Sequence, residues 1–205
     1  MEQRKRKIGI MGGTFDPIHI GHLVIAEAVR NEYNLDQVLF IPASTPPHKQ
    51  NLAVTSAIHR YIMTVMATYS NPYFYVSTIE MERTGPSYTV DTILALMEQF
   101  GDQTELFFIM GADSVQDLPT WNNAERLLEL CSIIAAARPG CGGKIDDIIR
   151  HFGPIGQQRI HRLATPELEI SSTDIRERVK TGNSIKYIVP DSVENYIGKE
   201  GLYRD

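Results

Sequence analysis

Two periods of apolar residues alternate along the chain. Short apolar runs of five to eight residues, such as KIGIM (7–11), have no helical period and are typical of buried strands. Between these runs, apolar residues recur every three or four positions, as Leu23, Ala26, Val29 and Tyr33 do. That spacing is typical of a helix with one buried face.

The order of these segments predicts the fold class. The predicted strands cover 7–11, 37–43, 74–80, 105–112, 132–137 and 159–164. The predicted helices cover 21–33, 56–69, 87–100, 122–130, 144–151, 172–180 and 191–199. Strands that alternate with helices form a parallel sheet, so we expect a doubly wound α/β fold with its ligand crevice at the carboxyl ends of the strands. No repeat or linker divides the chain. We therefore expect a single domain over 1–205, with a small helical part from about 171 to 205.

Composition narrows the class of partner. The chain has 205 residues, 42% of them hydrophobic, which suffices for one compact core. Its net charge of −5 argues against a broad nucleic-acid surface, so we expect a small-molecule ligand and no nucleic acid. The N-terminal apolar run is too short for a signal peptide or a membrane span. Cys131 and Cys141 form no ligand cluster and suit reduced thiols, which together predicts a cytoplasmic protein without a membrane partner. A homo-oligomer is compatible with the sequence.

The stretch GGTFDPIHIGH (12–22) carries the first candidate chemistry. It has neither the GxGxxG spacing nor the Lys-Ser/Thr ending of a P-loop. Gly12 and Gly13 let the backbone approach a ligand, and His19 and His22 flank a predicted helix start, whose free N–H groups favour phosphate. A zinc site is an alternative, although no third ligand is patterned nearby, and simple packing is another.

The same stretch resembles the signature of the HIGH-motif nucleotidyltransferases, and EISSTDIRERV (169–179) resembles their partner motif at a second helix start. Further segments extend the resemblance to the bacterial nicotinate-nucleotide adenylyltransferases over nearly the whole chain: PPHKQ (46–50), MERTGPSYTVDT (81–92), FFIMGADS (107–114) and IVPDSVENYIGKEGLY (188–203). This resemblance implies a Rossmann-like sheet and transfer of AMP from ATP to nicotinate mononucleotide, giving deamido-NAD and pyrophosphate with Mg²⁺ as cofactor.

On the ATP side, the resemblance implies that His19, His22 and Arg176 stabilise charge on the phosphates. The attacking and leaving groups are both phosphates, so no side-chain nucleophile is required and Mg²⁺ is held mainly by the nucleotide and water. The remaining ATP-binding candidates are Gly12, Gly13, Thr14, Phe15, Ser171, Ser172 and Thr173. Read locally, SSTDIR is also compatible with a plain helix N-cap followed by a solvent-facing arginine.

On the acceptor side, the resemblance assigns Ser87, Tyr88 and Thr89, at a predicted helix start, to the nicotinate carboxylate. Trp121 would stack on the ring, although a lone tryptophan is often a core residue. The rest of the acceptor is assigned to His48 and Lys49 for its 5′-phosphate and to Asp113 for its ribose. Lys49 could equally be a solvated loop charge. Segments 44–55 and 114–121 lack apolar periodicity and are candidate loops over the substrate.

Three other functions stay open at this point. A phosphopantetheine adenylyltransferase has similar phosphate motifs but does not need the GPSYT turn or the tryptophan loop. A class I aminoacyl-tRNA synthetase fragment also carries HIGH, yet this chain has no KMSKS-type loop and no basic surface. A non-enzymatic module would bind ATP without turnover. Pyrophosphate release with different acceptors separates these possibilities.

Overall fold

The computed structural model describes residues 4–45, 54–137, 142–166 and 168–204, without the side chains of 112, 113, 137 and 142. Its strands are β1 (Arg6–Gly13), β2 (Gln37–Pro42), β3 (Phe74–Val76), β4 (Thr104–Gly111), β5 (Ser132–Ala137) and β6 (Ile160–Ala164). Its helices are α1 (Ile20–Tyr33), α2 (Ala57–Thr68), α3 (Thr89–Phe100), α4 (Ala112–Gln116), η2 (Leu118–Thr120), α5 (Ala124–Leu130), α6 (Gly142–His151), α7 (Gly153–Arg159), α8 (Ser172–Lys180) and α9 (Asp191–Glu200).

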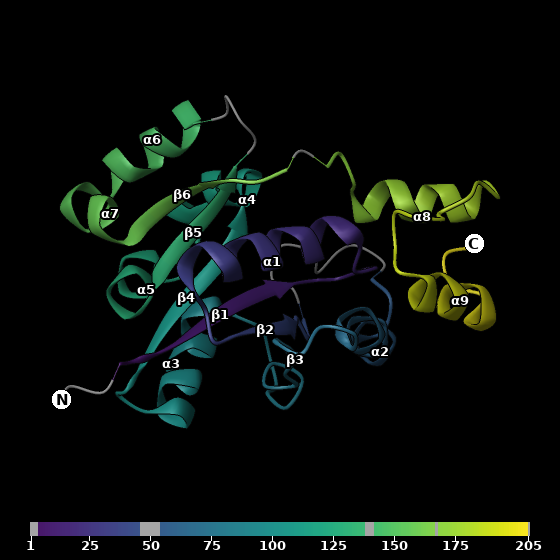
Figure 1. Ribbon diagram of the computed structural model, residues 1–205, viewed down its shortest axis with the longest axis horizontal. Coiled ribbons are helices and arrows are strands. Elements are labelled where there is room, and N and C mark those ends of the chain that lie inside the picture. The colour runs from purple at the N-terminus through teal and green to yellow at the C-terminus, as the bar shows by residue number, and fades with distance from the viewer. Residues whose placement is uncertain (1–3, 46–53, 138–141, 167, 205) are drawn as a thin grey trace.

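The six strands form one parallel sheet in the order β3-β2-β1-β4-β5-β6. The order runs outward from β1 in one direction and from β4 in the other, so the predicted doubly wound fold is confirmed. Figure 1 shows the sheet through the middle of the molecule, with α1 in front of it. The topological switch point lies between β1 and β4, where a ligand crevice is expected.

The two faces of the sheet pack against different helices. Because side chains alternate along a strand, Ile8 and Ile10 of β1 and Phe108 of β4 enter one core, whereas Phe107 and Ile109 enter the other. The first core includes buried residues of α3, α4, α5 and α6. The second includes buried residues of α1, α2, α8 and α9. The C-terminal helices thus belong to the same hydrophobic cluster as the N-terminal helix.

Two local predictions were wrong, and one helix was missed. The strand expected over 74–80 ends at Val76, because the backbone turns at Thr78, whose carbonyl accepts from the Met81 and Glu82 N–H groups. The loop expected over 114–121 is helical, in α4 and η2. Helix α7 was not predicted at all. Its Gly-Pro start resembles a turn in sequence, yet proline is well suited to the first turn of a helix.

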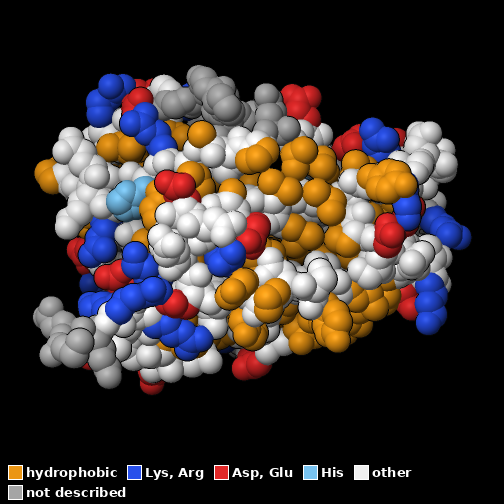
Figure 2. Space-filling model, in the orientation of Figure 1, with side chains coloured by type: hydrophobic (Ala, Val, Ile, Leu, Met, Phe, Trp, Pro, Cys, Tyr) orange, Lys and Arg blue, Asp and Glu red, His pale blue; other side chains and the backbone are white. Residues whose placement is uncertain are grey.

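The described surface carries charges of both signs. On the face in Figure 2, hydrophobic side chains gather near the middle, while acidic and basic side chains are interspersed toward the two ends. None of the helices in the described part of the chain has the length and apolar character to cross a membrane. Cys131 is a buried free thiol, and burial raises its pKa to about 12. Cys141 lies outside the described residues.

Candidate functional site

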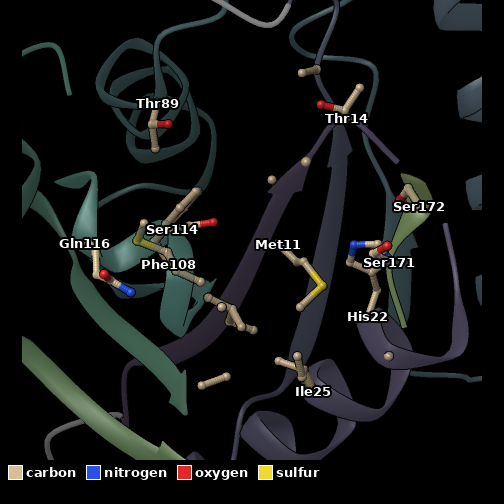
Figure 3. A pocket seen from close by; sticks show the side chains of 18 of the residues that line it. Met11, Thr14, His22, Ile25, Thr89, Phe108, Ser114, Gln116, Ser171 and Ser172 are labelled. Atoms are coloured by element: carbon tan, nitrogen blue, oxygen red, sulfur yellow. The ribbon is translucent and has the colours of Figure 1, made fainter. Parts of the chain in front are cut away.

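A pocket of about 1220 Å³ opens at the carboxyl ends of the central strands. Gly12 and Gly13 at the end of β1 line it together with Phe108 and Gly111 of β4, so the pocket lies at the switch point of the sheet. Single-ligand pockets usually measure about 300–1,000 Å³. Figure 3 shows two walls facing each other, with Thr89, Ser114 and Gln116 on one side and His22, Ser171 and Ser172 on the other.

The histidine wall is built by the first turn of α1. His19 is the N-cap residue, and its ring stacks on that of His22 with 3.7 Å between centroids. A Cβ atom on Gly21 would lie 3.0 Å from Nδ1 of His19, so any larger residue there would crowd the His19 ring. The glycine between the two histidines therefore allows both rings to pack over the helix start and line the pocket.

Both imidazoles are neutral near pH 7. Burial lowers the pKa of His19 to about 4. Burial, and next the nearby His19, lower the pKa of His22 well below its usual value. The backbone N–H of His19 donates to Nδ1 of His22 over 3.2 Å, which leaves the proton of neutral His22 on Nε2. His22 can therefore donate one hydrogen bond from Nε2, whereas buried Nδ1 of His19 has no partner among the described residues.

The partner motif reaches the same wall from the other end of the chain. Ser171 caps α8, its hydroxyl accepting from the Asp174 N–H over 3.0 Å. The Ser172 hydroxyl donates to the carbonyl of Pro17 over 2.9 Å and ties α8 to the loop after β1. Both serines line the pocket. Ser171 is thus the N-cap that the local pattern suggests, in a position where the cap also lines the pocket.

Some ATP-side candidates lie beside the pocket rather than in its lining. Arg176 donates from Nη1 to the carbonyl of Asp16 over 2.7 Å and from Nη2 to the Thr173 hydroxyl over 3.2 Å. Phe15 is buried, and its ring packs edge-on against His22 with 5.1 Å between centroids. A Cβ on Gly13 would lie 2.9 Å from that ring, so Phe15 supports the glycine loop from behind.

The opposite wall holds the acceptor candidates. Ser87, Tyr88 and Thr89 line the pocket where α3 begins, and the first N–H groups of a helix have no intrahelical partner. Such N–H groups favour an anion, helped by the helix dipole. Trp121 follows η2 and also lines the pocket, with its ring edge-on to Phe108 at 5.9 Å. Trp121 packs on the core and also lines the pocket, so a core role and a role in stacking on the nicotinate ring are compatible.

The sequence reasoning missed several lining residues. Glu80 is 7% exposed, and burial raises its pKa while hydrogen bonds from Thr92 and Ser87 oppose that rise. Within the described lining it is the one carboxylate. The other polar residues that were missed are Ser114, Gln116, Thr120, Asn122, Lys144 and Thr165. The acidic end of the apolar run FYVSTIE was an available signal for Glu80; for the others the chain shows no local pattern.

Two groups of candidates cannot be placed. His48 and Lys49 lie outside the described residues, and the side chain of Asp113 is likewise not described, although its backbone belongs to α4. Within the described ranges, no three His, Cys, Asp or Glu residues come together in a group that could hold a metal ion. The phosphate-side wall instead offers imidazoles, hydroxyls and backbone N–H groups, which are donors suited to anionic oxygen.

Comparisons with known proteins agree on one kind of enzyme. The family model described as cytidylyltransferase-like matches residues 10–178. A probable nicotinate-nucleotide adenylyltransferase of Thermoanaerobacter sp. is 52% identical over 98% of this chain and 96% of its own. Another, of Moorella thermoacetica, is 50% identical over 98% and 93%.

Solved structures share the fold at low sequence identity. The nicotinic acid mononucleotide adenylyltransferase of Plasmodium falciparum, complexed with NaAD, has a TM-score of 0.79 at 21% identity, covering 97% of each chain. A putative nicotinate-nucleotide adenylyltransferase of Vibrio parahaemolyticus has a TM-score of 0.72 at 19% identity, covering 98% of this chain and 96% of its own. These likenesses agree with the Rossmann-like class expected from the sequence.

Proposed function

The chain belongs to the cytidylyltransferase-like family, with nicotinate-nucleotide adenylyltransferases as relatives over nearly its whole length, and from this premise we propose that it adenylylates nicotinate mononucleotide. A 5′-phosphate oxygen of nicotinate mononucleotide attacks the α-phosphorus of ATP. The bond between that phosphorus and the oxygen bridging the α- and β-phosphates breaks, and pyrophosphate leaves. The other product is deamido-NAD, so the reaction serves NAD biosynthesis.

One observation carries this proposal: a single pocket brings the phosphate motifs and the acceptor turn face to face. His22 and Ser171 stand on one wall and Thr89 on the other, from three segments far apart in the chain. The volume of about 1220 Å³ suits two nucleotides better than one small ligand. Two bound phosphates need alignment more than a reactive side chain, because proximity and orientation supply much of the rate enhancement.

On the ATP side, donors at the pocket wall receive the phosphates. Nε2–H of His22 and the N–H groups after Ser171 stabilise the negative charge that develops on the leaving pyrophosphate. Neutral His19 adds a second imidazole to this wall. Arg176 uses Nη1 for the Asp16 carbonyl and Nη2 for the Thr173 hydroxyl, and its remaining N–H groups are donors for the β- and γ-phosphates. Gly12, Gly13 and Thr14 bring the backbone close to the nucleotide.

Mg²⁺ enters with ATP rather than through a protein ligand set. A divalent ion of this kind prefers carboxylate, carbonyl and water oxygens. Glu80, the carboxylate in the described lining, stands with the acceptor turn, where it contacts Thr92. The ATP-side donors would bind phosphate oxygens, so the phosphates and water would hold the metal, which would neutralise charge around the α-phosphate of the transferred AMP.

On the acceptor side, the N–H groups and hydroxyls around Thr89 bind the nicotinate carboxylate, and Trp121 stacks on the ring. His48 and Lys49 for the 5′-phosphate, and Asp113 for the ribose, are carried over from the family resemblance. The substrates are small nucleotides, and the net charge of −5 supports these ligands over nucleic acid, in keeping with an enzyme of the cytoplasm.

Pyrophosphate release tests the proposal directly. The purified protein is given MgATP with nicotinate mononucleotide, with nicotinamide mononucleotide, with phosphopantetheine or with no acceptor. We expect rapid release with the nicotinate acceptor and formation of deamido-NAD by chromatography. Faster release with phosphopantetheine would assign the pocket to another adenylyltransferase. ATP binding without release under any condition would leave only a nucleotide-sensing module.

A His22→Ala variant tests the phosphate wall. Loss of one preorganised donor costs roughly 100-fold in kcat, so we expect a decrease of about that size with an unchanged fold. Circular dichroism checks the fold. A turnover number close to that of the unsubstituted enzyme would remove His22 from the mechanism. Metal analysis after dialysis tests the zinc alternative, which requires retained zinc and inhibition by a zinc-specific chelator.

A further inference from the structure

Arg60 of α2 is a fully buried cation outside the pocket lining. It is 1% exposed, and all three guanidinium nitrogens donate to backbone carbonyls. Nε donates to Thr55 over 2.8 Å, Nη1 to Thr14 over 2.8 Å, and Nη2 to Ser44 over 3.2 Å. These three carbonyls belong to separate segments of the chain, so one planar group joins all three.

Specific interactions must offset the burial of a charged group, because removing the charge from water costs free energy. Burial lowers the pKa of Arg60, while the neighbouring Asp16, Tyr203 and Glu80 act in the opposite direction. An apolar side chain of similar volume often fills such a position at no loss of stability. The guanidinium can do what an apolar group cannot, since its fixed fork holds several acceptors at set directions.

Two of the three segments that Arg60 holds, those of Thr14 and Ser44, lead into the pocket. Thr14 lines the phosphate side, directly after the glycine pair. Ala43, the neighbour of Ser44, also lines the pocket. The next carbonyl, that of Thr45, accepts from the Ser87 N–H over 3.2 Å, and Ser87 opens the acceptor turn. A short chain of bonds therefore runs from the ATP-side loop through Arg60 to the acceptor turn.

We propose that Arg60 is a positioning residue that sets the placement of the ATP-side loop relative to the acceptor turn. The inference rests on the proposed adenylyl transfer, in which two separately bound phosphates must meet in line. Each half of the pocket keeps its own contacts without Arg60. Without Arg60 the two halves lose their fixed position relative to each other. A misplacement of about 1 Å can lower the rate roughly 100-fold.

The test compares Arg60→Gln with Arg60→Lys. We expect kcat for pyrophosphate release to fall roughly 100-fold in Arg60→Gln, with much smaller changes in KM for either substrate. Arg60→Lys keeps the charge and three donors but loses the planar fork, so it should recover part of the lost kcat. Thermal shifts caused by ATP alone and by nicotinate mononucleotide alone should persist in both variants.

Met63→Ala is the matched control, because Met63 is fully buried on the same helix, belongs to the hydrophobic core and is not among the residues that line the pocket. It should lower Tm without lowering kcat. An equal loss of kcat in this control, or unchanged kcat in both Arg60 variants, would overturn the inference. So would a loss confined to the KM of one substrate. If Arg60→Gln fails to fold, Arg60→Lys carries the same comparison. Absence of pyrophosphate release by the unsubstituted enzyme would instead refute the proposed function.

Discussion

Burial of the His19 imidazole couples the stability of this protein to pH. The pKa of His19 is about 4 in the folded chain, against 6.5 for an exposed histidine. Between these values the unfolded chain binds a proton that the folded chain does not, so stability is complete above pH 6.5 and decreases as pH falls toward 4. The shift corresponds to about 3 kcal/mol.

Urea denaturation at several pH values measures this effect. We expect the free energy of unfolding to decrease between pH 6.5 and 4.5, and the decrease to be smaller in a His19→Asn variant, which has no titrating ring. The pKa of His22 is lowered in the same direction, so part of the slope should remain in that variant. Identical slopes for both proteins would show that His19 is not the group responsible.

Two single residues should separate recognition of the acid from recognition of the ring. Thr89 lines the pocket at the start of α3, where free N–H groups and hydroxyls would suit a carboxylate and would leave a donor facing the NH₂ of an amide. That mismatch is worth roughly 2–4 kcal/mol, so we expect kcat/KM for the nicotinate acceptor to exceed that for the nicotinamide acceptor by about 30- to 1000-fold. Thr89→Ala should narrow this ratio.

Trp121→Ala is the companion variant, because stacking on the ring face hardly senses the substituent. It should weaken both acceptors and leave their ratio unchanged, as measured by kcat/KM in the same pyrophosphate assay. If Trp121→Ala alters the ratio more than Thr89→Ala does, the two roles are assigned the wrong way round. If the unsubstituted enzyme used the nicotinate and nicotinamide acceptors equally well, the assignment of the Thr89 turn to the carboxylate would be rejected.

At the scale of the element, the N-terminus of α8 has two roles, one structural and one facing the ligand. Substitutions of Ser171 can separate them. Ser171 caps the helix and lines the pocket. Ser171→Ala should lower the free energy of unfolding by about 1 kcal/mol through loss of the cap. Ser171→Asp keeps a good cap but places a negative charge where phosphate binds, so stability should be retained while KM for ATP rises.

Chemical denaturation and ATP titrations of the two variants provide the measurements. Ile175, fully buried one turn further along α8, keeps the helix docked in both proteins. A Ser171→Asp enzyme with normal KM for ATP would place the phosphates away from this helix. The cap would then be purely structural, as the local pattern alone also allowed.

At the scale of the whole molecule, ligand binding should stabilise the fold by mass action. MgATP at about 100 times its Kd adds about 2.7 kcal/mol, which for a chain of 205 residues corresponds to a rise of roughly 6 °C in Tm. Scanning calorimetry measures the shift. The His22→Ala variant should show a smaller rise at the same ATP concentration, because its Kd is larger. A rise of equal size in both proteins would mean that His22 contributes nothing to ATP binding.

The sequence by itself determined the class of fold and the edge of the sheet where chemistry occurs. Apolar periods of two kinds distinguish strands from helices, because each element must bury its own face. Their alternation then requires parallel strands, whose carboxyl ends share one edge. The motifs around His19, Ser171 and Thr89 all precede or open helices at that edge, so the pocket walls followed from local patterns and from the family resemblance.

Only the tertiary structure decided which distant groups meet. Glu80 turns into the pocket, Arg176 contacts the carbonyl of Asp16, and Arg60 joins three loops. A local motif singled out Arg176 and the apolar run before Glu80 was an available signal, but no local pattern shows which partner each residue meets. A lone polar residue looks the same in sequence whether it faces solvent, a pocket or a buried carbonyl. Their roles depend on contacts between segments as far apart as 160 positions, which form only when both faces of the sheet are packed.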